Sequence, residues 1–367
     1  MSLVSITRTN NGIKTGLIEA ISLIGGIEKY ISRTDKIMLK PNLNGTEGLT
    51  NIELTESLIQ LLLDFGAKKI VIAESTFGNA QITDMCFEKS GYSSLAKKYG
   101  IGIINLNKSE IAEVKVAKPL ITDKLKIAKE VFEVDKIINL PVMKVHYATA
   151  ITLAMKNLKG LLVGNEKKRF HELGLDKAIV DLNNTITPAL NIIDCTACME
   201  RMGPRGGDIV NLNLLLAGEN CAEVDYVGCL IMQHTLDDVK YLKMYIEQNN
   251  IDINAIKVVG ESIDSVKYPF KKAQMDITVP TQVKIHNINA CSACMNALLL
   301  SFQFLEKGFE ENADIYLGAK YSKKEIAEGL KISFGNCCFY DMDFDIKIKG
   351  CPPYPFDLKA EMEKRNG

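Results

Sequence analysis

Four cysteines near the end of the chain have the residue type and the spacing of a metal centre. Cys291 and Cys294 form a Cys-x-x-Cys pair, and Cys337 and Cys351 each follow closely after a glycine. A Cys-x-x-Cys turn lets two thiolates converge on one metal, and two distant cysteines can complete four ligands. The set predicts a [4Fe-4S] cluster, with zinc as the alternative occupant because zinc also takes four cysteines.

The other cysteines allow more than one interpretation. Cys338 neighbours Cys337, and two adjacent residues rarely bind one cluster, so we expect Cys338 to be buried and structural, although which of the two is the ligand stays open. Cys195 and Cys198 form a second Cys-x-x-Cys pair. They are candidates for a redox dithiol, half of a metal site or simple core packing.

A second group of residues that could bind a ligand or catalyse a reaction lies in the middle of the chain. Between residues 139 and 171 a single acid, Glu166, stands against six cations, which are Lys144, Lys156, Lys159, Lys167, Lys168 and Arg169. If residues 149–162 are helical, a narrow polar stripe follows, made of Thr149, Thr152, Lys156 and Lys159. Such a stripe on an otherwise apolar helix suits the wall of a cleft. The alternative is a solvated face with extended lysine side chains.

Other polar residues stand where predicted strands end. Ligands of open α/β sheets bind beyond the carboxyl ends of the strands, so these residues should converge with the basic stretch. We predict an anion-binding cleft in which Lys144, His146 and His171 are catalytic. The predicted substrate-binding residues are Lys40, Asn42, Glu74, Thr149, Thr152, Lys156, Lys159, Asp194 and Arg205. Neither a Walker phosphate loop nor a dinucleotide-binding glycine motif is present.

These residues must be positioned by alternating strands and helices. Apolar runs predict strands at 37–40, 69–75, 101–107, 136–144, 189–195, 211–219 and 256–262. Helical patterns cover 14–32, 53–65, 83–99, 149–162, 174–187, 222–232, 235–249 and 296–306. The alternation predicts an α/β fold with mostly parallel sheets covered by helices on both faces. We expect this domain to span residues 1–282, with a small Cys-rich α+β segment at 283–367.

The composition of the chain limits the classes of ligand and partner that we expect. Lys and Arg total 44 against 45 Asp and Glu, a formal net charge of -1, which argues against nucleic acid. No apolar run is long enough for a membrane span, and the N-terminus lacks the pattern of a signal peptide. The sequence therefore predicts a cytoplasmic protein with reduced cysteines. We expect an anionic small molecule or cofactor as ligand, a redox partner protein, and a homo-oligomer as one assembly.

The chain resembles the DUF362 family, a domain of unknown function. The resemblance covers about residues 35–240. It is carried by the runs 139–146 (NLPVMKVH) and 151–160 (ITLAMKNLKG), by His171, and by Lys40, Asn42, Glu74, Tyr92, Asp194, Gly203 and Asp225 in order. The resemblance implies an α/β fold and a site at these residues. Members are often fused to iron–sulfur segments, but the family as a whole has no established activity. The organisation of the chain also has a more distant similarity to that of nickel-pincer lactate racemases. The histidine spacing of those enzymes is not found in this sequence, so the resemblance does not imply a nickel cofactor.

Three functions are consistent with these features. The first is an iron–sulfur oxidoreductase or electron-transfer enzyme acting on an anion held in the Lys/His-lined cleft. The second is a non-redox racemase or isomerase, in which a Lys/His pair moves protons and the cluster is structural. The third is a metal-handling or maturation protein that uses the cysteines as a transient site.

Overall fold

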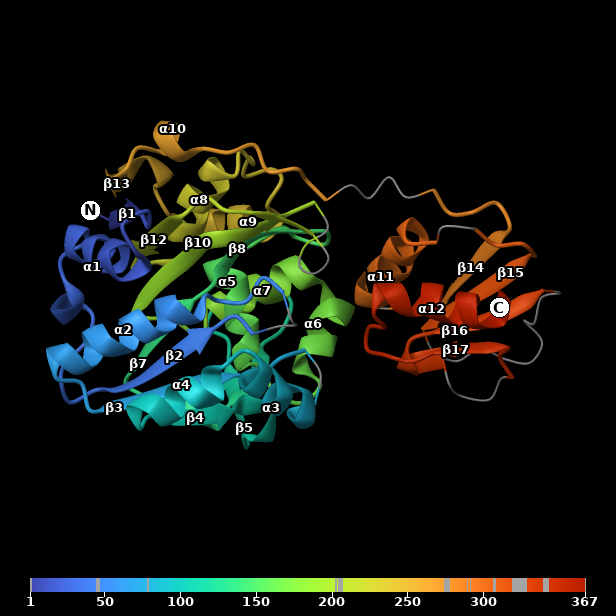
Figure 1. The fold of residues 1–367 in the computed structure, drawn as a ribbon, viewed down its shortest axis with the longest axis horizontal. Coiled ribbons are helices and arrows are strands. Elements are labelled where there is room, and N and C mark those ends of the chain that lie inside the picture. The colour runs from blue at the N-terminus through green and yellow to red at the C-terminus, as the bar shows by residue number, and fades with distance from the viewer. Residues whose placement is uncertain are drawn as a thin grey trace. The chain divides into compact units, whose positions relative to one another are not determined.

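The computed structural model describes residues 2–43, 47–77, 79–201, 203, 207–273, 278–288, 290, 292–305, 308–318, 329–338 and 343–366. Two compact units divide the chain, residues 1–273 and 274–367 (Figure 1). The sequence predicts this division at residue 282, which lies within the second unit of the structure. Two predicted site residues, Arg205 and Cys291, lie outside the described residues.

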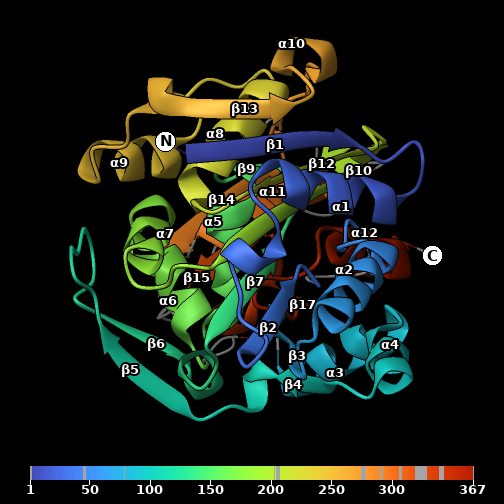
Figure 2. The same cartoon turned by 90° about the vertical axis from the view of Figure 1, so that its left-hand side faces the viewer.

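The first unit is built on one large sheet. The main strands are β1 (Ser2–Arg8), β2 (Lys36–Pro41), β3 (Lys69–Glu74), β4 (Gly102–Asn105), β7 (Lys136–Leu140), β10 (Leu190–Glu200), β12 (Leu214–Gly218) and β13 (Ile256–Gly260). Their order is β13-β1-β12-β10-β7-β2-β3-β4, and Figure 2 shows the first four side by side. Most neighbours pair in parallel, while β12 runs antiparallel to both β1 and β10. The predicted mostly parallel sheet is confirmed.

Shorter strands extend this sheet near the predicted cleft. They are β8 (Val142–His146), β9 (Ala150–Thr152) and β11 (Asp208–Val210), and a separate hairpin consists of β5 (Ile111–Lys115) and β6 (Lys124–Ala128). Strand β8 pairs in parallel with β10, and the register jumps from Asp194 opposite Val142 to Met199 opposite Lys144. The extra residues form a bulge in β10 that holds both Cys195 and Cys198.

Helices cover both faces of the sheet. The longer ones are α1 (Ile13–Leu23), α2 (Ile52–Phe65), α3 (Ala80–Lys89), α4 (Tyr92–Tyr99), α6 (Glu166–Leu173), α7 (Leu175–Asn183), α8 (Cys221–Ile231) and α9 (Lys240–Gln248). The short ones are α5 (Ala154–Asn157), α10 (Ile263–Val266), η1 (Ile27–Lys29), η2 (Leu106–Lys108), η3 (Lys129–Phe132), η4 (Leu158–Leu161) and η5 (Ile253–Ala255).

Alternate residues of the strands enter two separate cores. Leu215 and Ala217 of β12 pack with α1, α2 and α4, whereas Leu214 and Leu216 pack with α5, α7, α8 and α9. Successive side chains of a strand point to opposite faces, so a strand buried on both faces is continuously apolar. The continuous apolar runs of the sequence therefore reflect a sheet covered on both sides.

The second unit has a smaller sheet. Strands β14 (Val283–Ile288), β15 (Ala313–Gly318), β16 (Leu330–Phe334) and β17 (Ile346–Ile348) pair in parallel in that order. Helices α11 (Ser292–Gln303) and α12 (Pro355–Asn366) contribute Leu298 and Leu358 to its core, and η7 (Asn336–Cys338) follows β16. The described strands thus form a parallel α/β layer, where the sequence predicts an α+β arrangement. No helix among the described residues of either unit has the length and apolar character needed to cross a membrane.

Every predicted strand of the first unit contains a strand of the structure, although the run at 136–144 forms two, β7 and β8. The strands β1, β5, β6, β9 and β11 were not predicted. Three predicted helices differ. The helix expected at 14–32 ends at Leu23, because Gly25 and Gly26 adopt φ of 112° and 85°. Gly91, with φ of 82°, separates α3 from α4. The helix expected at 149–162 was wrong over its first part: β9 pairs with β8, and only α5 and η4 are helical. Ala150, with φ of 60°, lies outside the helical region.

Helix α5 is fixed to the core by one buried carboxylate, which generates a test. Asp225 of α8 is fully buried and accepts hydrogen bonds from the amides of Ala154 at 2.6 Å and Met155 at 3.0 Å. Asp225→Ala should lower the free energy of unfolding of the full chain by about 2–4 kcal/mol, because two buried amides lose their acceptor. Urea denaturation measures this change. The control Asp252→Ala removes an exposed cap of η5 and should cost about 1 kcal/mol or less. Equal losses in the two variants would contradict the assignment.

Candidate functional site

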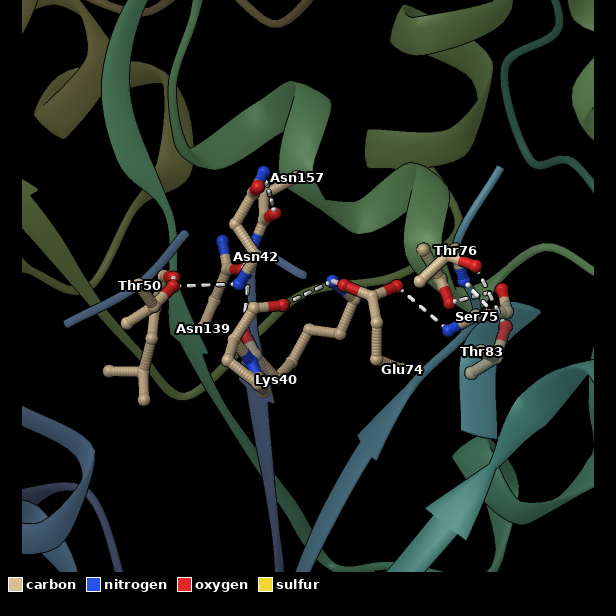
Figure 3. A network of polar contacts seen from close by, with 12 residues as sticks. Lys40, Asn42, Thr50, Glu74, Ser75, Thr76, Thr83, Asn139 and Asn157 are labelled. Carbon is tan, nitrogen blue, oxygen red and sulfur yellow. Dashed lines mark hydrogen bonds and ion pairs between the residues drawn. The ribbon is translucent and has the colours of Figure 1, made fainter. Parts of the chain in front are cut away.

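A buried ion pair lies at the carboxyl ends of β2 and β3. The Nζ of Lys40 lies 2.5 Å from Oε2 of Glu74, with both side chains almost completely inaccessible (Figure 3). Lys40 also donates to the carbonyl of Pro41 at 2.9 Å, and Glu74 Oε1 accepts from the Ser75 amide at 2.8 Å. Burial lowers the pKa of Lys40, and the charge of Glu74 opposes that shift. Each member of the ion pair therefore has a further hydrogen bond to the backbone.

Gly160 closes over this ion pair. A β-carbon at this position would overlap Glu74 Oε1 and come within 2.5 Å of Lys40 Nζ. The carbonyl of Gly160 accepts from the amide and hydroxyl of Ser75, at 3.0 and 2.7 Å. The loop that carries the Lys-Gly motif is therefore fixed against the end of β3.

A row of buried asparagines connects the ion pair to the next lysine. Asn42 Nδ2 donates to Asn157 Oδ1 at 3.0 Å, Asn157 Nδ2 donates to Asn139 Oδ1 at 2.8 Å, and Asn139 Nδ2 donates to Asn191 Oδ1 at 2.9 Å. Asn42 Oδ1 then accepts from Lys144 Nζ at 3.2 Å. The sequence analysis did not predict Asn139, Asn157 or Asn191 as site residues. Asn139 and Asn157 do lie in the runs 139–146 and 151–160 that carry the family resemblance.

Two further lysines are held mainly by neutral groups. Lys156 is buried, and its Nζ donates to the hydroxyls of Thr149 at 2.9 Å and Thr152 at 3.0 Å. Burial, followed by the charge of Lys159, holds the pKa of Lys156 well below its ordinary value. The residues of the predicted stripe therefore come together, but they do not belong to one helix. Thr149 precedes β9, Thr152 ends β9, Lys156 lies in α5 and Lys159 lies in η4.

Lys159 belongs to the same cluster. Its Nζ lies 3.3 Å from Nε2 of His171 in α6, and burial lowers its pKa to about 7. Burial, with the charges of Lys159 and Lys156, keeps the pKa of His171 well below the usual range. At neutral pH, His171 is therefore uncharged and Lys159 is partly protonated.

His146 ends β8 beside these lysines. Its Nδ1 accepts a hydrogen bond from the amide of Ala148 at 3.0 Å. Burial, then Lys156 and Lys159, hold the pKa of His146 well below its ordinary value, so the ring is neutral. His146 and Thr149 line a cavity of about 260 Å³ together with His234 and Asp176, which sequence reasoning missed. Those two residues come from the α8–α9 connection and from α7, and no local motif marks them.

Asp194 has a structural position. Its carboxylate accepts from the Asn51 amide, at the start of α2, at 2.7 Å and from the amide and hydroxyl of Thr196, at 2.9 and 2.7 Å. Burial raises its pKa while these bonds oppose the shift. Asp194 thus anchors α2 and the bulge of β10 close to the predicted site.

The described cysteines of the second unit gather at one edge of its sheet. Strands β16 and β17 run in parallel, so the loops that carry Cys337 and Cys351 leave from the same edge. A β-carbon at Gly335 would lie 3.0 Å from Sγ of Cys294 and 3.8 Å from both the Gly350 carbonyl and Pro353 Cδ. The thiol of Cys294 therefore lies against the junction of both loops.

Three other described cysteines, Cys338, Cys195 and Cys198, are buried. The thiol of Cys338 is buried and lies 3.0 and 3.1 Å from the carbonyls of Tyr316 and Gly318. Cys195 and Cys198 are fully buried, and burial together with the neighbouring Cys198 thiol raises the pKa of Cys195 well above its ordinary value. Within the described ranges, which exclude Cys291, no three His, Cys, Asp or Glu side chains are grouped as metal ligands.

The closeness of Gly160 to the ion pair gives a second test. Gly160→Ala should cost about 3–5 kcal/mol of unfolding free energy, because the new methyl group separates two buried charges. The control Gly102→Ala places its methyl 3.0 Å from a Val71 side-chain carbon and should cost about 1 kcal/mol. Chemical denaturation of both full-length variants measures the difference. If Gly160→Ala unfolds at the same denaturant concentration as the control, the packing of Gly160 on the pair is not as described.

Similarity to known proteins covers part of this chain. The chain is 29% identical over 221 residues to the thylakoid-associated protein sll1697 of Synechocystis sp., covering 57% of this chain and 67% of that protein. The lactate racemase apoprotein of Thermoanaerobacterium thermosaccharolyticum aligns with a TM-score of 0.41 at 13% identity, over 62% of this chain. This chain spans 57% of the racemase, less than two thirds of its length. A protein of Thermotoga maritima aligns with a TM-score of 0.42 at 13% identity, over 85% of this chain and 73% of that one.

A family model matches the region that contains the ion pair, the asparagine row and the lysine cluster. The match spans residues 37–230, and its description is domain of unknown function (DUF362). It includes β2, where Lys40 lies, and continues through most of α8, where Asp225 lies. By this match, the chain belongs to the DUF362 family.

Proposed function

We propose that this protein is an iron–sulfur oxidoreductase whose first unit binds a small organic anion at the lysine cluster, defined as Lys144, Lys156, Lys159, His146 and His171. The second unit would hold a [4Fe-4S] cluster that supplies the redox function. The observation that carries the proposal is that the buried Lys156 and the half-buried Lys159 have neutral hydrogen-bond partners.

Among the described residues, no carboxylate forms an ion pair with Lys156 or Lys159, although the charge of Asp176 acts on Lys156 from farther away. These lysines are therefore receptive to an anion. Removing an ammonium group from water costs several kcal/mol unless a counter-charge is present. In the lysine cluster that cost appears as lowered pKa values for Lys156 and Lys159. A bound anion would supply the missing counter-charge and restore the protonated forms. The same cations would repel a positively charged ligand.

The neighbouring ion pair has a different role. Lys40 is already neutralised by Glu74 and lies under Gly160. It is therefore a poor anion ligand and a good anchor for the loop that carries Lys159. We assign Lys40, Glu74 and the asparagines to positioning, and Lys156, Lys159 and His146 to ligand contact.

The pH dependence of binding tests this assignment. Sulfate keeps a constant charge between pH 6 and pH 8, whereas Lys159, with a pKa of about 7, changes from mostly protonated to mostly neutral. Because binding favours protonated Lys159, sulfate affinity should fall about tenfold from pH 6 to pH 8. Isothermal titration calorimetry measures the dissociation constants.

Two variants make the pH test specific. Lys159→Met should weaken sulfate binding and flatten its pH profile. Lys168→Met, which changes a more exposed lysine of α6 that pairs with Glu172, should leave both unchanged. Binding that strengthens with rising pH, or equal effects of the two substitutions, would refute the role of Lys159.

The proposed metal centre rests on the cysteines of the second unit. Thiolates are the ligands that iron–sulfur clusters take, and Cys294 lies against the loops of Cys337 and Cys351. Cys291, the fourth proposed ligand, immediately precedes α11, which carries Cys294 in its first turn. Bound there, the cluster would supply one-electron chemistry, and burial and hydrogen bonds around the thiolates would tune its potential.

Metal analysis of the anaerobically purified full chain tests this centre. We expect iron and sulfide with broad visible absorption, and loss of both in Cys294→Ser. Cys338→Ser changes a cysteine whose thiol contacts two backbone carbonyls, and it should retain the absorption. Stoichiometric zinc instead of iron would remove the main support for electron transfer, and an unchanged spectrum in Cys294→Ser would exclude that ligand.

A second candidate function is a proton-transferring isomerase with a structural cluster. The observation that favours it is the contact between Lys159 and His171, because a lysine with a pKa of about 7 can give and take protons at neutral pH. Activity that survives complete reduction or loss of the cluster would favour this candidate over the oxidoreductase.

A further inference from the structure

The cavity beside the lysine cluster has properties that the proposed anion binding does not explain. Its volume is about 260 Å³, and its walls include His146, Thr149, Asp176, His234, Lys240 and Lys272. Pockets for drug-sized ligands span about 300–1,000 Å³, so this cavity suits a small metabolite. All of these residues belong to the first unit.

Two polar atoms of residues that line this cavity are buried without hydrogen-bond partners. They are Nε2 of His234, whose residue is only 3% exposed, and Oδ1 of Asp176. Buried polar atoms in folded proteins almost always have partners, supplied by protein, water or ligand. Their concentration around one cavity indicates that something polar completes the site.

The two histidines of the cavity present opposite hydrogen-bonding groups. Nδ1 of His234 lies 3.1 Å from the carbonyl of Met232, which can only accept, so Nδ1 carries the proton and Nε2 offers a lone pair. Nδ1 of His146 accepts from the Ala148 amide, so in the neutral ring the proton is on Nε2, which can donate. Burial lowers the pKa of both rings, which keeps them neutral.

The charges that line the cavity are balanced, because Lys240 and Lys272 stand beside Asp176 and Asp238. Asp238 is paired with Lys272 at 2.6 Å, and Lys156 contacts the hydroxyl of Thr149 in the cavity wall. The expectation of an anionic ligand therefore comes from the lysine cluster proposed above. The group that donates to His234 should be a neutral hydroxyl rather than an ammonium.

We propose that this cavity binds a small hydroxy carboxylate, whose hydroxyl donates to Nε2 of His234 and whose oxygen accepts from Nε2 of His146. The proposal rests on the anion binding proposed above and adds the chemical class of the ligand. His234 is then the residue that determines specificity, because a carboxylate that lacks the hydroxyl leaves Nε2 unpaired. A site built to bind a hydroxyl discriminates strongly against the analogue without it.

The test compares carboxylates that differ only by the hydroxyl. The probes are glycolate against acetate, L-malate against succinate, and citrate against tricarballylate, each titrated calorimetrically into the full-length protein at pH 7. We expect the hydroxylated member of at least one pair to bind tenfold or more tightly than its partner. Imidazole nitrogen NMR on histidine-labelled protein should show the Nδ1-protonated form of His234 and a shift of its Nε2 resonance when the hydroxylated member binds.

Two substitutions of the same residue separate the roles of its nitrogens. His234→Asn can keep the donor to the Met232 carbonyl but loses the Nε2 acceptor, so the preference for the hydroxylated member should disappear. His234→Gln can keep an acceptor near the Nε2 position, so part of the preference should survive. His286→Asn, in the second unit, is the control and should preserve the whole preference.

The outcomes separate this proposal from the one on which it rests. If both members of each pair bind equally and Lys156→Met weakens both, anion binding stands and the hydroxyl-specific site is overturned. If no probe binds, both proposals fail at this cavity. An Nε2-protonated His234 in the NMR spectrum would also overturn the assignment, even where the variants do not fold.

Discussion

The ion pair between Lys40 and Glu74 is the contact on which the predicted site depends. Both groups are buried at the ends of adjacent parallel strands, and removing either partner would leave an uncompensated charge in the core. Such a pair adds little net stability over an apolar contact, but it admits few alternative arrangements. With Gly160 packed against it, the pair fixes the loop that carries Lys159, and the asparagine row extends this order to Lys144.

Beyond the ion pair, the first unit keeps positive charge in places where water does not compensate for it. The neutral partners of Lys156 orient its ammonium group without neutralising it. The low pKa of Lys159 is the measurable consequence of the same burial. Keeping these lysines protonated costs free energy in the ligand-free protein, and a bound anion removes that cost. The site therefore favours negatively charged ligands over neutral ones.

Both units use the same geometric device. Parallel strands end at a common edge, so residues that directly follow different strands come together although they are far apart in the chain. In the first unit this edge collects Lys40 and Glu74, and in the second it collects the loops of Cys337 and Cys351. The sheet determines where chemistry can occur, and the loops determine which chemistry it is.

The sequence by itself determined most strands of the main sheet, its cover on both faces and the cluster of lysines, because continuous apolar runs and local charge are properties of neighbouring residues. It missed β1, which lies between β13 and β12. It also placed Cys338 in a buried position. It could not show that Thr149 and Thr152 precede rather than form a helix, since pairing of β9 with β8 overrides local helical pattern. Only the tertiary structure brought His234 and Asp176 to the cavity of His146, because these residues come from segments that are distant in the chain. It also set the histidine tautomers, because the local backbone conformation decides whether each ring meets the amide or the carbonyl two residues away.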